Sequence, residues 1–352
     1  MALLGGKKRI IGLDIGSSSI KVAELDESKK GYKLLNFGMV SLPSEAIVDG
    51  AIMNSPAVVE AIKTLISERK IKTKEVTTSV SGASVMTRRI TLPLMSDDEL
   101  DEQIQWEAEQ AIPYNISEMN LAHEVLHRGD EDMEVLLIAA KKDLVNDYVT
   151  VITEAGLLPM IMDVDGFSVL NCYEMNYQIM ENEVLALVNI GSSIINVIIT
   201  KGGRCLFARD LTMGGNLFTE EIMKELSVNH DEAELLKIGG SATGEEEAVM
   251  RQEVEAVIRR VSEQIVSDVA KSLDFYQATA AEDQITKVWL AGGGCRTSGL
   301  AEALQRKQNI PVELMDPFRN IQRDAKLNEY LEQIGPRAAV CLGLAMRRVG
   351  DK

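Results

Sequence analysis

The sequence has few cysteines and no long apolar run. Its four cysteines, Cys172, Cys205, Cys295 and Cys341, lie far apart and form no CxxC pair, so neither a zinc knuckle nor a redox pair is indicated. Each lies within or beside an apolar segment, which predicts reduced, mostly buried thiols. No apolar run reaches the roughly 18 residues that a membrane-spanning helix needs, and the N-terminal residues lack the order of a secretory signal. The sequence therefore predicts a cytoplasmic protein.

Positive charge is scarce as well. The chain has 54 acidic residues against 37 lysines and arginines, which gives a net charge of −17. A surface this acidic repels phosphate backbones and anionic lipid, so neither nucleic acid nor the membrane itself is expected as a direct partner. The composition of the 352 residues, 45% hydrophobic and 26% charged, is typical of globular proteins, and the length suggests two or three domains.

The N-terminal part of the chain predicts a strand-rich unit with one helix. Residues 9–26 have the pattern of a buried strand, a tight Gly-Ser turn and a second strand. The helix has an N-terminal signal, because Asn54 and Ser55 precede Pro56. The further elements predicted here are a strand at 32–42, the helix at 55–70 and a strand at 75–81.

After Gly82 the pattern changes to short strands that alternate with two helices. Ser96 and Glu99 form a capping box that opens the first helix, which runs to Ala111 before Pro113 ends it. The elements predicted to follow are strands at 121–127 and 133–140, a helix at 143–155 and a strand at 158–163. Together these elements predict a compact βαββαβ insertion over residues 83–162.

A nine-residue motif occurs twice in the chain. Asp-Ile-Gly-Ser-Ser-Ser-Ile-Lys-Val at 14–22 aligns with Asn-Ile-Gly-Ser-Ser-Ile-Ile-Asn-Val at 189–197, and six of the nine positions are identical. Both copies lie between apolar runs of β character, so the repeat predicts two similar lobes that face one another. Two such turns can hold one polyphosphate between them, because glycine lets the backbone approach and successive N–H groups and serine hydroxyls point at the oxygens.

The repeated turns supply most of the candidate nucleotide-binding residues. Asp14 is expected to bind Mg²⁺ through water, because Mg²⁺ prefers a hard carboxylate and keeps several waters. Lys21 is expected to neutralise phosphate charge. The candidates for phosphate binding within the turns are Gly16, Ser17, Ser18, Ser19, Asn189, Gly191, Ser192 and Ser193.

A glycine run near the C-terminal end of the chain forms a third part of the predicted site. The strand at 287–291 ends in Gly292, Gly293 and Gly294, and a helix is predicted to start near Ser298. This arrangement suits close passage beside an α-phosphate and adenosine. Neither a GxGxxG nor a Walker A pattern occurs, which excludes Rossmann and P-loop sites.

One zinc-protease pattern is a false lead. His123-Glu124-Val125-Leu126-His127 matches HExxH, but that chemistry requires a helix that turns both imidazoles toward one metal ion. The segment alternates between apolar and polar residues and precedes a charged turn, which predicts a strand. We therefore expect no metal site here.

The phosphate turns, the glycine run and a predicted apolar helix at 337–348 resemble the actin-like ATPase superfamily. Met213-Gly214-Gly215-Asn216, with Glu234 and Lys237 further along, resembles its FtsA and MreB branch. The resemblance implies an α/β, actin-like fold, which is a duplicated ribonuclease H-like fold with two lobes, and a small α+β insertion subdomain. It also implies ATP and Mg²⁺ as cofactors, with Glu234 and Lys237 at the ribose and adenine and with Gly214, Gly215 and Asn216 in the same site. The implied division is 1–82, 163–182 and 335–352 for the first lobe, 83–162 for the insertion and 183–334 for the second lobe.

Nearly the whole chain resembles the PilM family of type IV pilus assembly proteins. The most specific segment is Glu107-Ala108-Glu109-Gln110-Ala111-Ile112-Pro113-Tyr114, supported by the segments at 310–318 and 343–347. The resemblance implies a cytoplasmic component of the inner-membrane assembly platform that uses ATP as a conformational switch. It implies that the insertion grips the cytoplasmic N-terminal tail of the membrane protein PilN, so that contact with the membrane is indirect. Pilus motor ATPases, other platform proteins and a second copy of the chain are further partners that the resemblance allows.

The chain departs from the actin-type ATPases at one position, since Asn189 stands where they carry an acid. Asn is a poorer Mg²⁺ ligand, so slow or absent hydrolysis is expected, and the chain is at most a weak ATPase. Asp165, with Asp163 beside it, is the candidate for the acid that positions water. Two alternatives stay open: a small-molecule kinase of the same superfamily, and an FtsA-like filament-forming membrane scaffold. The kinase would need an acidic base in a substrate pocket, and the scaffold would need an amphipathic C-terminal helix, and neither is apparent.

Overall fold

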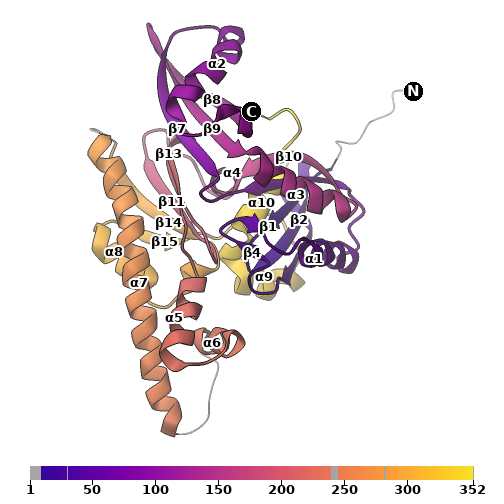
Figure 1. Cartoon of the computed structure of the whole chain (residues 1–352), viewed down its shortest axis with the longest axis vertical. Coiled ribbons are helices and arrows are strands. Elements are labelled where there is room, and N and C mark those ends of the chain that lie inside the picture. The colour runs from indigo at the N-terminus through magenta and orange to yellow at the C-terminus, as the bar shows by residue number, and fades with distance from the viewer. Residues whose placement is uncertain (1–8, 30, 239–244, 281–282, 352) are drawn as a thin grey trace.

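Two five-stranded sheets with the same topology form the body of the molecule in the computed structural model, which describes residues 9–29, 31–238, 245–280 and 283–351 (Figure 1). The first sheet has the order β10 (Leu158–Val164), β6 (Glu75–Val80), β1 (Ile11–Ile15), β2 (Ser19–Ser28) and β3 (Gly31–Ser41). The second has the order β15 (Val312–Leu314), β14 (Ile285–Ala291), β11 (Val184–Ile190), β12 (Ile195–Lys201) and β13 (Arg204–Leu211). In each sheet an antiparallel meander of three strands is extended by two strands that run parallel to its first strand. The two predicted lobes therefore share one strand plan, as the repeated motif indicated.

The side chains of the central strands alternate between two apolar cores. In β11, Val184, Ala186 and Val188 face the outer core of the second lobe, whereas Leu185 and Leu187 face the core between the two sheets. This period of two is the natural consequence of the pleat. A central strand that is buried on both faces therefore has an almost unbroken apolar sequence.

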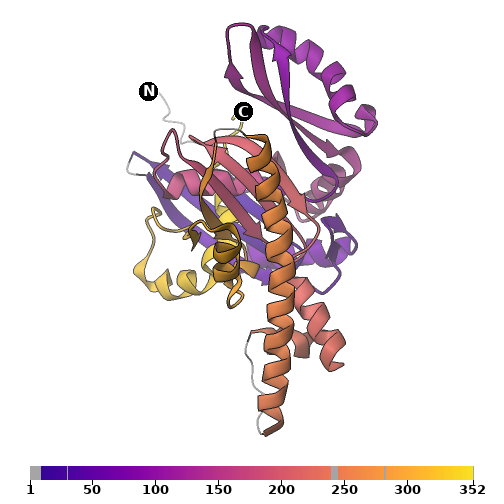
Figure 2. The same cartoon turned by 90° about the vertical axis from the view of Figure 1, so that its left-hand side faces the viewer.

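Helices cover both faces of each sheet. Between the sheets lie α4 (Asp165–Asn176) and α10 (Ala339–Met346), which pack against each other and whose buried residues belong to the central core. The outer face of the first sheet is covered by α1 (Ser55–Glu68) and α3 (Lys142–Glu154). The outer face of the second is covered by α5 (Asn216–Leu226), α7 (Glu245–Thr279) and α8 (Leu300–Gln308). The long helix α7 runs along this sheet and projects beyond it (Figure 2). The two lobes also contain the hairpin of β4 (Ile47–Val48) and β5 (Ala51–Ile52), α6 (His230–Lys237) and α9 (Asn328–Ile334).

The helix α10 is buried on all sides because it fills the space between β1 and α4. Every residue from Ala339 to Ala345 is buried. At Gly343 a Cβ atom would overlap the carbonyl oxygen of Ser168 in α4, so the two helices cross at the distance that only glycine permits. The uniformly apolar sequence of this helix follows from its central position.

The insertion is a separate small layer at one end of the molecule (Figure 1). Its three-stranded sheet has the order β7 (Val85–Pro93), β9 (Asp132–Lys141) and β8 (Met119–Arg128), and α2 (Asp97–Ala111) packs on it. The predicted capping box is present, because Ser96 accepts from the Glu99 backbone and the Glu99 side chain accepts from the Ser96 backbone. Apolar residues of α2 and of the three strands form a core of their own.

The helices and strands follow the expected βαββαβ order, but the last two, α3 and β10, do not pack with the insertion. The strand β10 pairs in parallel with β6 of the first sheet, and α3 packs on α1 over the same sheet. The chain thus returns to the first lobe at Lys142 rather than after residue 162. The division of the chain into domains stays a prediction, and we propose 83–141 as the extent of the insertion.

Among the described residues, no helix combines the length and the apolar character that crossing a bilayer requires. Residues 1–8, on which the expectation about a secretory signal rests, lie outside the described residues.

Candidate functional site

The two copies of the repeated motif form equivalent turns. The Gly16 amide donates to the Ser19 carbonyl at 3.2 Å, and the Gly191 amide donates to the Ile194 carbonyl at 3.0 Å. Each turn joins the first two antiparallel strands of its sheet. The repeat in the sequence is therefore also a repeat in the backbone.

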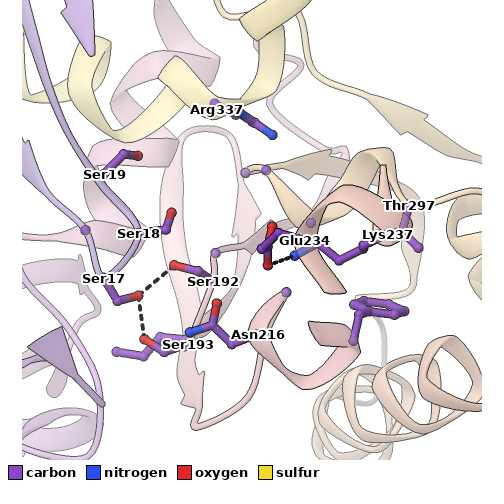
Figure 3. Close-up of a pocket in the computed structure, with 18 of the residues that line it drawn as sticks. Ser17, Ser18, Ser19, Ser192, Ser193, Asn216, Glu234, Lys237, Thr297 and Arg337 are labelled. Carbon is purple, nitrogen blue, oxygen red and sulfur yellow. Dashed lines mark hydrogen bonds and ion pairs between the residues drawn. The ribbon is translucent and has the colours of Figure 1, made fainter. Parts of the chain in front are cut away.

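The two turns meet across the gap between the lobes. The hydroxyl oxygen of Ser17 lies 2.6 Å from that of Ser192 and 2.8 Å from that of Ser193 (Figure 3). These hydroxyls and those of Ser18 and Ser19 line a cleft of about 1090 Å³. Serine hydroxyls can donate to anionic oxygens, so the turns present donors from both lobes to one cleft.

The same strand register holds a charged pair in the first lobe and a neutral pair in the second. Asp14 lies opposite Lys21, whose Nζ donates to Asp14 Oδ2 at 2.9 Å, and both side chains are buried. Asn189 lies opposite Asn196, and its Nδ2 donates to Asn196 Oδ1 at 2.8 Å. All four residues line the cleft. At this register position the cleft is therefore lined by a charged pair on the first lobe and by a neutral amide pair on the second.

The glycine run after β14 packs closely behind the second turn. Gly292 has a φ of +85°, and a Cβ there would overlap the Ile190 carbonyl. Its amide donates to the Pro336 carbonyl at 3.0 Å. Gly292, Gly293 and Gly294 all line the cleft, so the third predicted part of the site joins the first two.

The helix α6 brings Glu234 and Lys237 to the opposite side of the cleft (Figure 3). Lys237 donates to Glu234 and to Thr219, and Thr219 also donates to Glu234. Burial would raise the pKa of Glu234, but the hydrogen bonds from Lys237 and Thr219 outweigh it and lower that pKa. The ion pair between these two residues is thus already formed, and the ribose and adenine contacts that the family resemblance implies for them stay a prediction.

The segment Gly214-Gly215-Asn216 supports the second turn. The Gly215 amide donates to the Gly191 carbonyl at 2.9 Å, and the Asn216 amide donates to the Ser192 carbonyl at 2.8 Å. Gly215 and Asn216 line the cleft, whereas Gly214 lies behind the turn, where a Cβ would meet the carbonyls of Gly191 and Ser192. The nucleotide-contact role expected for Gly214 is therefore better described as close packing of the turn.

Asp165 opens α4 at the inner end of the cleft. Its Oδ1 accepts from the Ser79 hydroxyl at 2.6 Å. Burial, with the nearby charge of Asp14, raises the pKa of Asp165 to about 6. Asp163 is not among the residues that line the cleft, and its Oδ2 lies 3.4 Å from Arg347 Nε. Of the two candidate acids, Asp165 is the one that lines the cleft, and its catalytic role stays a prediction.

Sequence reasoning missed two residues at the site. Arg337 lines the cleft, and within the described residues its guanidinium makes no hydrogen bond or ion pair (Figure 3). It is the one charged residue in a buried apolar stretch, and this contrast is the signal that could have revealed it. Asp210 in β13 is half-buried beside the second turn, and its Oδ1 accepts from Asn196 Nδ2 at 2.8 Å. No local pattern marks it.

A second, smaller hollow lies beside the insertion. It has a volume of about 400 Å³ and runs along β8, an edge strand. Its lining comprises Asp97, His123, Glu124, Val125, Leu126, His127, Arg128 and Arg204. The HExxH segment belongs to β8, so the expected strand is confirmed and the helical arrangement of a zinc protease is not formed.

Comparisons with known proteins place these features in a family. The family described as type IV pilus assembly protein PilM matches residues 12–349. The solved PilM-PilN type IV pilus biogenesis complex contains a chain with 27% identity, which this chain covers completely and matches over 98% of its own length with a TM-score of 0.87.

More distant likenesses concern the fold alone. The ethanolamine utilization protein EutJ of Carboxydothermus hydrogenoformans is 14% identical, with a TM-score of 0.58 over 96% of this chain and 89% of that one. MreB5 of Spiroplasma citri, solved with ADP, is 14% identical, with a TM-score of 0.53 over 96% and 95%. The Escherichia coli K12 protein EutJ is 26% identical over 135 residues, which is 38% of this chain and only 42% of that curated relative. Together with the repeated sheets, these likenesses confirm the predicted actin-like fold.

Proposed function

The chain belongs to the family of the type IV pilus assembly protein PilM, and from that premise we propose that it binds Mg-ATP between its lobes and the cytoplasmic N-terminal tail of PilN at its insertion. In this proposal the nucleotide is a conformational switch within an inner-membrane assembly platform. The protein would be cytoplasmic and would reach the membrane only through PilN. The observation that carries the nucleotide site is the meeting of the two serine turns across the cleft, at Ser17, Ser192 and Ser193.

The chemistry of the cleft supports a polyphosphate ligand. Lys21, Lys237 and Arg337 bring positive charge to it from three different elements of a strongly acidic protein. Backbone amides at the two glycine turns add directional donors. A ligand that touches both turns would favour the closed arrangement of the lobes, because it binds that arrangement better than an open one.

Asp14 is the residue that would hold Mg²⁺. Its Oδ2 accepts from Lys21, whereas its Oδ1 accepts no hydrogen bond from the described residues. A hard carboxylate oxygen with that freedom fits a Mg²⁺ ion that keeps several waters. When bound, the ion would neutralise phosphate charge beside the Ser17 turn.

Hydrolysis in this cleft is proposed to be slow. Asn189 offers a neutral amide where an acid would bind metal more strongly, and its Nδ2 is already engaged by Asn196. Asp165 could orient or deprotonate a water, because a pKa near 6 leaves it mostly ionised at neutral pH while keeping it a usable base. Its carboxylate is held by Ser79, which fixes its direction.

The hollow along β8 is the proposed place for the PilN tail. An edge strand has unpaired backbone groups, so an extended peptide can add to it as a further strand. His123, His127 and Arg204 offer side chains of mixed character for specificity. The similar chain in the solved PilM-PilN complex supports PilN as the partner.

The test is isothermal titration of the purified protein with a synthetic PilN N-terminal peptide, with and without Mg-ATP. Peptide binding at micromolar or lower Kd that changes with nucleotide would support both the partner and the switch. Binding that ignores the nucleotide would reduce ATP to a structural ligand. Failure of the peptide to bind, with nucleotide binding intact, would leave an actin-like nucleotide-binding protein with another partner. A scrambled peptide and the Asp14→Asn variant serve as controls for the two sites.

A further inference from the structure

A chain of buried and partly buried hydrogen bonds runs from the second turn of the cleft into the first lobe. Asn189 Nδ2 donates to Asn196 Oδ1 at 2.8 Å, and Asn196 Nδ2 donates to Asp210 Oδ1 at 2.8 Å. The other oxygen of Asp210 accepts from the Gly82 amide at 2.7 Å. Asp210 belongs to the second sheet and Gly82 follows β6 of the first, so the last link joins the two lobes.

Gly82 is the root of the insertion. Its carbonyl accepts from the Val85 amide at 2.9 Å where β7 begins, and the Lys141 amide donates to Ser84 at 3.0 Å where β9 ends. The first residue of β7 and the last residue of β9 are therefore hydrogen-bonded to residues at or next but one to Gly82, which bonds to Asp210. The strands β13 and β7 also pack against each other.

The second turn also packs directly against Gly82. Gly82 has a φ of +94°, and a Cβ there would lie 3.0 Å from the Cδ1 of Ile194, a residue of the second turn. A Cβ at Gly50 would lie 3.6 Å from the same Cδ1. Movement of the second turn would therefore press on the root by contact as well as through the hydrogen bonds.

The neutral residue at position 189 gives this chain of bonds its direction. Because Asn189 donates to the Asn196 oxygen, the Asn196 Nδ2 is free to point toward Asp210. The Asp210 carboxylate then accepts two hydrogen bonds, one from Asn196 and one from the Gly82 amide. An acid at 189 could only accept. It would turn the Asn196 amide around and leave the Asn196 oxygen facing the Asp210 carboxylate. The departure from the actin-type acid thus fits a structural task in addition to slow hydrolysis.

We propose that Asn189, Asn196 and Asp210 form a relay that couples nucleotide occupancy of the cleft to the position of the insertion, so that nucleotide and peptide alter each other's affinity. The relay rests on the proposed function, because it needs both ligands. Asn196 and Asp210 act in it as positioning residues. Coupling of this kind is reciprocal, so it can be measured from either ligand.

The experiment measures the ratio of peptide Kd without and with saturating Mg-ATP in the full-length protein. Asp210→Asn keeps the shape of the side chain but leaves one acceptor for two donors, Asn196 and Gly82. The matched control is Asp163→Asn, which alters a buried acid of the first sheet outside the relay. We expect a ratio of about 5-fold or more in the wild type and in the control, and below about 2-fold in Asp210→Asn.

A second measurement is independent of the variant. The rate of amide hydrogen exchange at residues 82–85 in the wild-type protein should change when Mg-ATP alone is added. If the relay does not couple the two sites, this rate should stay the same. An unaltered coupling ratio in Asp210→Asn would overturn the relay and leave the proposed function intact. A wild type that binds both ligands without coupling would overturn the relay together with the switch role of the nucleotide, and would leave only the two binding functions. Loss of nucleotide or peptide binding by the wild type would instead refute the proposed function and the relay with it.

Discussion

At the scale of single residues, the two lobes place different side-chain pairs at the same register position of equivalent strands. Asp14 and Lys21 form an ion pair, and Asn189 and Asn196 form an amide pair in the equivalent strands. A buried ion pair gains little over a neutral pair because both charges lose their water. Removing one partner is different, since the other charge then stays buried without compensation.

This asymmetry predicts the outcome of copying the second lobe into the first. Lys21→Asn alone should lower the free energy of unfolding by about 3 kcal/mol, because Asp14 loses its partner. The double variant Asp14→Asn with Lys21→Asn should recover most of that loss while it loses Mg-nucleotide binding. Urea denaturation measures the first effect and titration with Mg-ATP the second. A double variant no more stable than the single one would contradict the argument.

Asp165 predicts a pH dependence of stability. Its pKa is raised from an ordinary 3.8 to about 6, so the folded state prefers the neutral acid. That contribution is fully present below pH 3.8 and is lost as pH rises through about 6, at most roughly 3 kcal/mol. Asp165→Asn keeps an acceptor for Ser79 and should therefore raise Tm at pH 7.5 by a few degrees.

The control for this prediction is the pH series itself. The difference in Tm between Asp165→Asn and the wild type should shrink steadily between pH 7 and pH 4.5, as the wild-type acid takes up its proton. An equal difference at every pH would show that the variant acts through packing rather than through charge.

Local patterns predicted the residues of the site that lie in or beside the repeated turns, and the family resemblance added residues of α6, but two residues of the site were missed. Ser17 and Ser192 stand in a repeated motif, so both could be identified without a structure. Arg337 and Asp210 could not be, because each reaches its place only after distant strands and helices have packed. Asp165 is intermediate: the sequence shows an acid at a strand end, but not that Ser79 would face it.

At the scale of elements, the sequence predicted the positions of helices and strands along the chain more accurately than it predicted their packing partners. The strand β10 and the helix α3 were expected within a few residues of their bounds, but with the wrong neighbours. Parallel pairing of β10 with β6 joins segments that lie on either side of the insertion. Apolar period alone carries no information about such a distant partner, since several strands of the chain have the same pattern.

The crossing of α10 and α4 gives an element-scale prediction. In Gly343→Ala the new methyl group would overlap the Ser168 carbonyl, and backbone cannot move aside easily in a filled core. We expect a loss of at least about 1–3 kcal/mol of stability, visible as a lower Tm. The matched control is Gly129→Ala in the turn between β8 and β9, where the nearest obstacle is the flexible end of the Asp132 side chain. Equal Tm values for the two variants would contradict close packing at Gly343.

At the scale of the whole molecule, the cleft is where the two lobes depend on each other. Residues of both sheets line it, and the serine contacts and the Asp210–Gly82 bond cross between the lobes. A ligand that spans the cleft therefore binds both lobes of the folded chain at once, and the unfolded chain has no such binding site.

Mg-ATP is accordingly expected to raise the thermal stability of both lobes together. At 100 times its Kd, the gain in unfolding free energy is about 2.7 kcal/mol. Differential scanning calorimetry should show one transition that moves upward with nucleotide concentration, and no movement in Asp14→Asn. Two transitions of which only one moves would show that the ligand binds a single lobe.

The burial of α10 between β1 and α4 also has a consequence for how the chain is made. A ribosome produces β1 before all the other described helices and strands, and α10 after them. Domains generally fold as they emerge, but the inner face of the first sheet has to wait for a helix that arrives last. During that wait the nascent chain exposes the apolar surface that later becomes the central core. Chaperones that shield such surface have a period of access that ends when α10 takes its place.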